Sequence, residues 1–250
     1  MTLFRNVVFI AALAGLVSGI LMTALQAYAT VPLILHAETY ENADEGHSHD
    51  TAAPAADGQT AEAAPAAHEH EEEAWAPEDG FERYAYTALA NVITGIGFAL
   101  VLVAVSELAG GIVGWRQGVF WGFAGFAVFT LAPGLGLPPE LPGMPAADLA
   151  ARQVWWIGTV IATAAGLWLI AFRTSIAFAL IGVALLVVPH IIGAPQPESH
   201  DTAVPGDLHH QFVVAVTITN LIFWVVLGAV AGVIRNRFVA SAQGLRDSFA

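Results

Sequence analysis

The sequence predicts an all-α fold, a polytopic membrane helix bundle with six transmembrane helices and a long, disordered outer loop that is acidic and histidine-rich. The first observation behind this prediction is composition, because 56% of the 250 residues are hydrophobic and only 12% are charged. The second is distribution, since the apolar residues form long blocks, several near the roughly 20 residues that cross a hydrocarbon core. The third is that charged residues gather between these blocks, a pattern unlike that of soluble proteins.

The first apolar block, residues 7–35, is the first predicted span. Ala11, Gly15 and Gly19 recur at every fourth position, which gives a smooth helix face for close packing in a membrane. An alternative interpretation is a secretory leader, because Ala27-Tyr28-Ala29 has the form that signal peptidase accepts, and its removal would leave five spans. The apolar stretch exceeds the roughly 7–15 residues of a leader's core, which favours a retained span.

Five further apolar blocks complete the prediction, and glycine or proline residues mark most of the connections between them. They cover residues 84–109, 119–131, 154–172, 176–192 and 212–234. The chain is therefore divided into a first transmembrane helix (1–35), a loop (36–83) and a five-helix transmembrane domain (84–250).

The loop at residues 36–83 holds fourteen of the 21 Asp and Glu residues. One pattern occurs twice in it, a pair of histidines separated by a single residue. The pairs are His47 with His49 and His68 with His70. Its linker is rich in Ala and Pro and too poor in large apolar residues to fold alone. We expect a mobile segment that binds cations weakly and releases them quickly. The alternative is a solvated acidic loop whose histidines are incidental.

Arginines predict the orientation, because basic residues near span ends stay on the cytoplasmic side. Threading six spans leaves Arg83 and Arg152 outside and puts the remaining six arginines inside. Those six are Arg5, Arg116, Arg173, Arg235, Arg237 and Arg246. Both termini are therefore expected in the cytoplasm and the histidine-rich loop outside it. The same threading places all nine histidines outside or at the outer membrane edge.

Nitrogen and oxygen are the only metal ligands this chain offers, since it contains no cysteine. Imidazole and carboxylate together suit divalent cobalt, nickel or zinc. The candidate ligands are His36, His47, His49, His68, His70, Glu140, His190, Asp207, His209 and His210.

The candidate ligands at the membrane edge lie at the ends of predicted transmembrane helices, which are rigid. His190 follows Pro189 at the end of the fifth span, and His209 and His210 begin the sixth. We expect them to converge with His36 in an outer vestibule, with Asp207 or Glu140 adding oxygen ligands. The alternative is that His209 and His210 bind lipid headgroups and that His190 makes a backbone hydrogen bond.

Polar residues within spans are costly in lipid and so mark candidates for a transport pathway. Gln26, Asn91 and Asn220 fall in the outer half of their spans under the predicted orientation. Amides also hold helices together, which is the alternative role for each. Glu107 lies near the cytoplasmic end of the second span, either as an exit-side cation or proton group or as an interfacial residue beside Arg116.

No enzyme motif is present. The chain has no phosphate-binding G-x-x-x-x-G-K-[ST] loop, no H-E-x-x-H and no G-x-S-x-G. We therefore expect neither an enzyme nor an organic cofactor. We also expect no nucleic-acid partner. Ion movement would have to use a gradient, the membrane potential, a coupled ion or a separate energising partner.

Several segments resemble a known family. They are Pro138-Pro139-Glu140-Leu141-Pro142-Gly143, Arg152-Gln153 with Trp155-Trp156, Thr159 and Thr163, and Pro189-His190 before Gly193-Ala194-Pro195. Together they resemble the CbtA-type predicted cobalt transporter subunits of bacteria. The resemblance implies a multi-pass protein of the bacterial inner membrane that imports cobalt for cobalamin synthesis. It also implies a small, single-span, histidine-bearing partner of the CbtB type and functional roles for Glu140, His190, His209 and His210.

Two functions follow as hypotheses. The first is a membrane subunit that takes up a divalent transition metal, with cobalt favoured by the resemblance. The second is a membrane buffer or sensor that binds metal and delivers it to a partner without transporting it.

Overall fold

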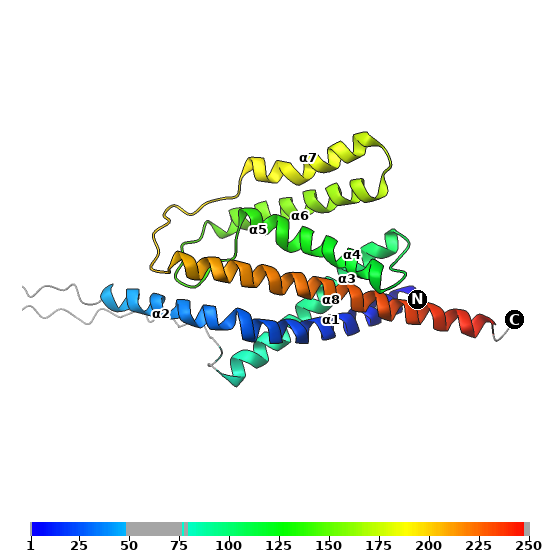
Figure 1. The fold of residues 1–250 in the computed structure, drawn as a ribbon, viewed down its shortest axis with the longest axis horizontal. Coiled ribbons are helices and arrows are strands. Elements are labelled where there is room, and N and C mark those ends of the chain that lie inside the picture. Colours follow the sequence, from blue (N-terminus) through cyan, green and yellow to red (C-terminus); the bar gives the residue numbers. More distant parts are fainter. Residues whose placement is uncertain (1, 49–76, 78–79, 248–250) are drawn as a thin grey trace, which may run out of the picture.

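The computed structural model describes residues 2–48, 77 and 80–247 and shows an elongated bundle of helices (Figure 1). Within these residues all regular structure is helical, which confirms the all-α prediction. The elements are α1 (Thr2–Ala29), α2 (Val31–Ser48), α3 (Phe81–Leu108), α4 (Trp115–Phe126), the π-helix η1 (Ala127–Leu131), α5 (Ala132–Gly136), α6 (Leu149–Phe172), α7 (Ile176–Ile192) and α8 (Gly206–Asp247).

Five of the described helices are long and apolar enough to cross a membrane. They are α1, α3, the continuous segment α4–η1–α5, α6 and α8. The remaining expected span falls on α7, an apolar helix of 17 residues. At 1.5 Å per residue α7 is about 25 Å long, somewhat less than the roughly 30 Å hydrocarbon core. The five long spans agree with the prediction, and the sixth stays a prediction.

Two crossings built on glycine hold the central helices together. On α1, Gly15 and Gly19 lie against the backbone of α3 at Gly95–Ile96 and Asn91–Val92. On α4, Gly118 lies against the backbone of Gly228 in α8. A Cβ at any of these positions would meet backbone atoms, so the small side chain permits the close approach. The sequence pattern at Gly15 and Gly19 predicted such packing.

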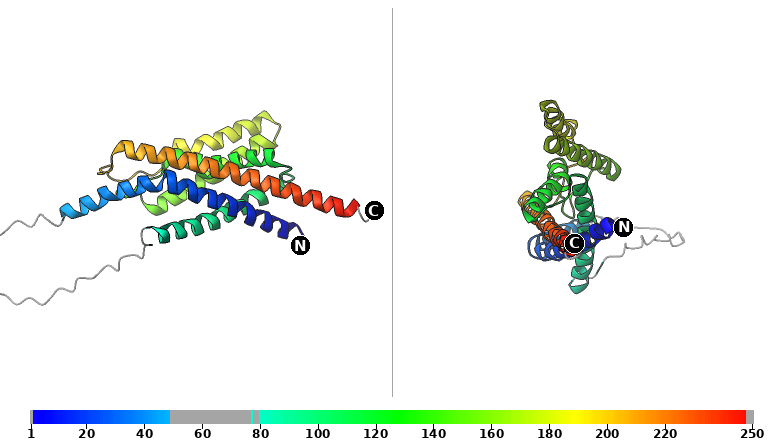
Figure 2. Two further views of the ribbon diagram at one scale, coloured as in Figure 1. Left: turned by 60° about the horizontal axis from the view of Figure 1, so that its bottom comes forward. Right: turned by 90° about the vertical axis from the view of Figure 1, so that its right-hand side faces the viewer.

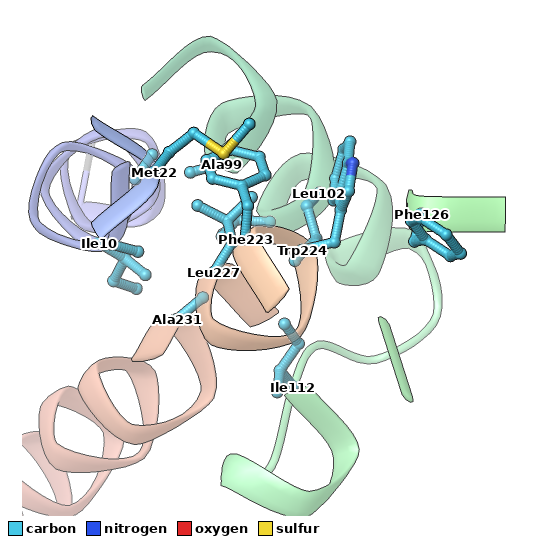
Figure 3. Packing of buried hydrophobic residues seen from close by; sticks show 13 residues of the cluster. Ile10, Met22, Ala99, Leu102, Ile112, Phe126, Phe223, Trp224, Leu227 and Ala231 are labelled. Atoms are coloured by element: carbon cyan, nitrogen blue, oxygen red, sulfur yellow. The ribbon is translucent and has the colours of Figure 1, made fainter. Parts of the chain in front are cut away.

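Large side chains fill the space between these crossings (Figure 3). Trp224 of α8 is 1% exposed and stacks on Phe129 with ring centroids 5.5 Å apart. Ile10, Met22, Leu102 and other residues of α1, α3, α4 and α8 complete this core. Helix α1 contributes Ile10, Ala11, Ala14 and Met22 to this core.

The π-helix η1 interrupts the third span just before Pro133. Proline has no N–H to donate to the carbonyl of Phe129 four residues earlier, and its ring crowds that carbonyl. The turn therefore widens to the π form, which often occurs as a short interruption of this kind. At the same place the Trp224 indole N–H donates to Thr130 Oγ1 at 3.3 Å, so the interruption is tied to α8.

The α6–α7 hairpin stands to one side of the other helices (Figure 2). Its two helices approach closely at Gly166 and Gly182. It joins the rest of the bundle through η1 and α5 and through the ring pairs Trp121–Phe172 and Phe129–Trp156. The hairpin is therefore an attached layer and contributes no residue to the central core cluster.

Helix α2 corrects one expectation. Residues 36–48, assigned from sequence to the disordered loop, continue as a helix. Leu33, Ile34, Ala37 and Tyr40 form an apolar stripe at helical spacing and pack in a second cluster with Leu141, Val204, Leu208 and Phe212. The acidic composition concealed this short stripe. The remainder of the expected loop lies mostly outside the described residues.

Candidate metal-handling site

The described histidines gather at one end of the molecule. His36 lies in α2, His190 in the last turn of α7, His200 in the α7–α8 connection, and His209 and His210 at the start of α8. Figure 1 shows these segments at the end opposite both chain termini. The side chain of His47 and all of His49, His68 and His70 lie outside the described residues.

His209 is the best positioned of these candidates. Its Nε2 lies 3.1 Å from the carbonyl oxygen of Pro139. A carbonyl oxygen only accepts, so Nε2 is the donor of this hydrogen bond, and in the neutral imidazole Nδ1 is then the nitrogen whose lone pair can bind a metal. Leu208 and Phe212, buried in the second apolar cluster, fix this turn of α8. The side chain is therefore held as a metal-ligating histidine usually is, by its second nitrogen.

Glu140 follows Pro139 and carries an ion pair. Its Oε2 lies 3.0 Å from a guanidinium nitrogen of Arg152 in the first turn of α6. Asp148 caps that helix by accepting from the Ala151 N–H at 2.8 Å. Glu140 is half-buried and would have to share Arg152 with any cation that it bound. The structure thus places one predicted oxygen ligand next to the segment that His209 contacts.

His190 lies on the hairpin, against a different partner. Its ring meets the Trp155 ring edge-on with centroids 6.0 Å apart, and the Trp155 indole N–H donates to the Pro189 carbonyl at 3.3 Å. His36, Asp207 and His210 are exposed. The described residues hold no group of three or more histidines and carboxylates placed to bind a metal. The expected convergence of His36, His190, His209 and His210 is therefore not seen.

Gln26 and Asn91, two of the pathway candidates, meet between α1 and α3. The Asn91 Nδ2 donates to Gln26 Oε1 at 2.6 Å and to Thr23 Oγ1 at 3.1 Å. Thr23 in turn donates to the Gly19 carbonyl. Sequence reasoning missed Thr23, which had no signal beyond its spacing of one turn from Gln26. Asn220 differs, because its amide donates to the Val216 carbonyl within its own helix at 2.9 Å.

Glu107 pairs with Arg235, a partner that sequence reasoning did not name. Two guanidinium nitrogens lie 2.6 and 3.1 Å from its two carboxylate oxygens, and a third donates to the Ile112 carbonyl at 2.9 Å. The side chains are 20% and 17% exposed. Gly111, at φ +78°, leaves the space that the guanidinium fills. The pair joins α3 to α8 at the end of the bundle that holds both termini.

Comparison with known families adds independent information. The model of the CbtA family, described as probable cobalt transporter subunits, matches residues 4–236. The chain belongs to the CbtA family. This membership confirms the resemblance carried by the Pro138–Gly143 and Pro189–Pro195 segments, and it covers every described helix apart from the ends of α1 and α8. With five span-length helices, this CbtA-family chain is a multi-pass membrane protein. No curated protein and no solved structure matches it.

Proposed function

We propose that this chain is the membrane subunit of an uptake system for a divalent transition metal, with cobalt as the favoured substrate. The observation that carries the proposal is the gathering of the described histidines at one end of a CbtA-family helix bundle, opposite both termini. Imidazole and carboxylate are the ligands that this metal class prefers. The orientation proposed from the arginines puts that end outside the cytoplasm of a bacterial inner membrane.

Capture would begin at the end of α2 and in the segment that follows it. His47, His49, His68 and His70, with the carboxylates around them, would bind the ion weakly and pass it to the membrane edge. Nδ1 of His209 is the first fixed ligand on that route, since Nε2 is held by Pro139. Glu140, His190, Asp207, His210 and His36 are the further candidates, and a site would require movement of α7 or of the loop to bring them together.

Passage through the bilayer is proposed to use the polar groups between α1 and α3. Gln26 and Asn91 would offer amide oxygens in the outer half of the membrane. Glu107 lies at the opposite end, already neutralised by Arg235. An inside-negative potential drives a divalent cation inward by about 4.6 kcal/mol per 100 mV, twice the value for one charge. A small histidine-bearing partner of the CbtB type remains part of this proposal.

A second function is favoured by the packing. Between the Asn91 cluster and Glu107, α1 and α3 touch backbone to backbone at Gly15 and Gly95. Between Gly15 and Gly19, the Ser18 hydroxyl is fully buried without a hydrogen-bond partner among the described residues. Ala99 and Val103 beyond this crossing are fully buried. Such a closed interface suits a membrane buffer or sensor that binds metal outside and hands it to a partner.

His209 provides the test. In metal-starved cells producing the chain and its partner, both H209A and H209Q should raise the cobalt concentration for half-maximal uptake by roughly tenfold, the lower end of the effect of disturbing a metal-ligand shell. Glutamine retains a donor for the Pro139 carbonyl but has no ring nitrogen. Recovery by H209Q would show that the residue only positions the Pro139 segment. H200A, in the exposed α7–α8 connection, is the matched control and should leave uptake unchanged.

A further inference from the structure

A groove of about 390 Å³ lies between the central helices and the hairpin, lined by α3, α4, η1, α6 and Trp224 of α8. It exists because the hairpin meets α4 and η1 mainly through large rings, Trp121 against Phe172 and Phe129 against Trp156. Small residues such as Ala124 and Ala164 stand between these contacts and leave the space open. The groove belongs to none of the metal candidates described above.

The lining shows what kind of molecule fits. Every lining side chain except Gln117 is apolar or aromatic, or is glycine. Val101, Phe120 and Phe172, which line it, are 45%, 72% and 45% exposed. In a membrane-spanning bundle such exposed apolar side chains face lipid, so the groove opens to the hydrocarbon. Gln117 alone among these lining side chains is an amide, so the groove suits an apolar molecule far better than an ion or a polar solute.

The size separates two apolar occupants. At about 30 Å³ for each water-sized group, 390 Å³ holds roughly thirteen such groups, and a methylene is similar in size. That matches one acyl chain. A transmembrane helix is about 10–12 Å across and 30 Å long, which makes its volume several times larger. The groove is therefore of a size that one acyl chain would fill.

The charge at one end identifies the lipid class. Arg116 precedes the lining residue Gln117, and Arg173 follows the lining residue Phe172, so both flank the same end of the groove. Both are exposed. Arg116 lies over the Trp115 ring at 5.5 Å and Arg173 over the Phe178 ring at 5.8 Å. Within the described part of the chain neither takes part in an ion pair, which leaves two guanidinium groups for an anionic headgroup.

We propose that this groove binds one acyl chain of an anionic phospholipid, whose phosphate lies at Arg116 and Arg173. The lipid would fill the gap between α4 and α6 and so attach the hairpin to the central helices. Guanidinium groups match phosphate geometry. Each basic residue near an anionic surface contributes about fivefold to binding, so the pair predicts roughly a thirtyfold preference for an anionic over a zwitterionic headgroup.

Native mass spectrometry of the full chain in mild detergent tests this proposal. Phosphatidylglycerol and phosphatidylcholine with identical acyl chains would be titrated in parallel. We expect one phosphatidylglycerol to be retained, with phosphatidylcholine retained far more weakly. R116Q/R173Q should reduce phosphatidylglycerol retention to the phosphatidylcholine level. R5Q, which removes an exposed arginine of α1 away from the groove, should leave the preference intact.

A second experiment fills the groove with larger side chains. A164W or A124L should abolish retention of both lipids, and G158A, on the same helix with open space around it, should not. Size-exclusion profiles and helical circular dichroism identify a variant that fails to fold. If one of the two filling variants does not fold, the other still tests the proposal. Retention of no lipid by the parent chain, equal retention of both lipids, or unchanged binding in a folded filling variant would each overturn the proposal.

Discussion

The ion pair with Arg235 changes the role that we assign to Glu107. From sequence, Glu107 was a candidate exit-side group or a neighbour of Arg116. In the structure it makes two contacts with Arg235, which also binds the Ile112 carbonyl. Both carboxylate oxygens are occupied, so the geometry favours a structural link between α3 and α8 over a free cation site.

This link can be measured by a double-mutant cycle. E107Q should destabilise the fold by about 2 kcal/mol, because it leaves a partly buried guanidinium without its counter-ion. R235Q should do the same, and E107Q/R235Q should cost clearly less than the sum of the two. Thermal unfolding in detergent gives the three values. Strictly additive losses, or lost uptake with unchanged stability in E107Q, would instead return Glu107 to the transport pathway.

The same residues show how far the sequence reaches at this scale. The cost of placing polar groups in lipid marked Gln26, Asn91 and Glu107 as pathway candidates, with helix–helix contacts as the alternative role of the two amides. This cost did not identify their partners. Thr23 and Arg235 are distant from Asn91 and Glu107 along the chain, and only the crossing of α1 with α3 and of α3 with α8 brings them together. His209 is similar, since its Pro139 contact depends on a loop fold that no periodicity encodes.

At the scale of helices, the crossing of α4 with α8 rests on Gly118 and Gly228. Each would place a Cβ against the backbone of the other helix. G118A and G228A should therefore lower stability by about 1–3 kcal/mol, the usual cost of overpacking. G97A on α3 is the matched control, because its Cβ would meet nothing within 4 Å. Thermal unfolding of the three variants measures these losses of stability. Unchanged stability in G118A and G228A would mean that the backbones of α4 and α8 do not approach this closely.

The acidic loop makes a prediction about affinity. Replacing His47, His49, His68 and His70 by alanine should reduce cobalt uptake about tenfold when the metal is scarce and leave the maximal rate unchanged, because a loose ligand set concentrates the ion without forming the selective site. Replacing four nearby alanines of the same loop by serine controls for a change in loop composition. Loss of uptake at saturating cobalt would show that these histidines belong to the pathway itself.

Helix boundaries were predictable where apolar length decided them and not where packing did. The bounds of α3 and α6 lie close to those of the predicted spans. The first predicted span, 7–35, is divided at Thr30 into α1 and α2, and α8 extends beyond the predicted 212–234 at both ends. Helix α2 was missed because the stripe of Leu33, Ile34, Ala37 and Tyr40 is short and embedded in acidic sequence. The π-helix was missed because it depends on both Pro133 and the Thr130–Trp224 hydrogen bond across two helices.

Across the whole molecule, charge distinguishes the two ends. Arg83 and Arg152, the arginines expected outside, pair with Glu38 at 2.8 Å and Glu140 at 3.0 Å. Arg116 and Arg173, expected inside, are exposed and lie over aromatic rings. The outer arginines are thus offset by carboxylates, whereas exposed positive charge remains at the other end. The orientation predicted from basic residues near the span ends stays a prediction.

Transport into sealed vesicles tests the central claim most directly. The chain, together with the proposed small partner, would be reconstituted into liposomes that enclose a cobalt-sensitive fluorophore. An inside-negative potential of about 100 mV, worth roughly 4.6 kcal/mol for a divalent ion, would be imposed. We predict a luminal cobalt signal that rises with the potential, falls in H209Q and is absent from protein-free liposomes. Cobalt that stays on the outer surface, is removed by an external chelator and never reaches the lumen would contradict the account.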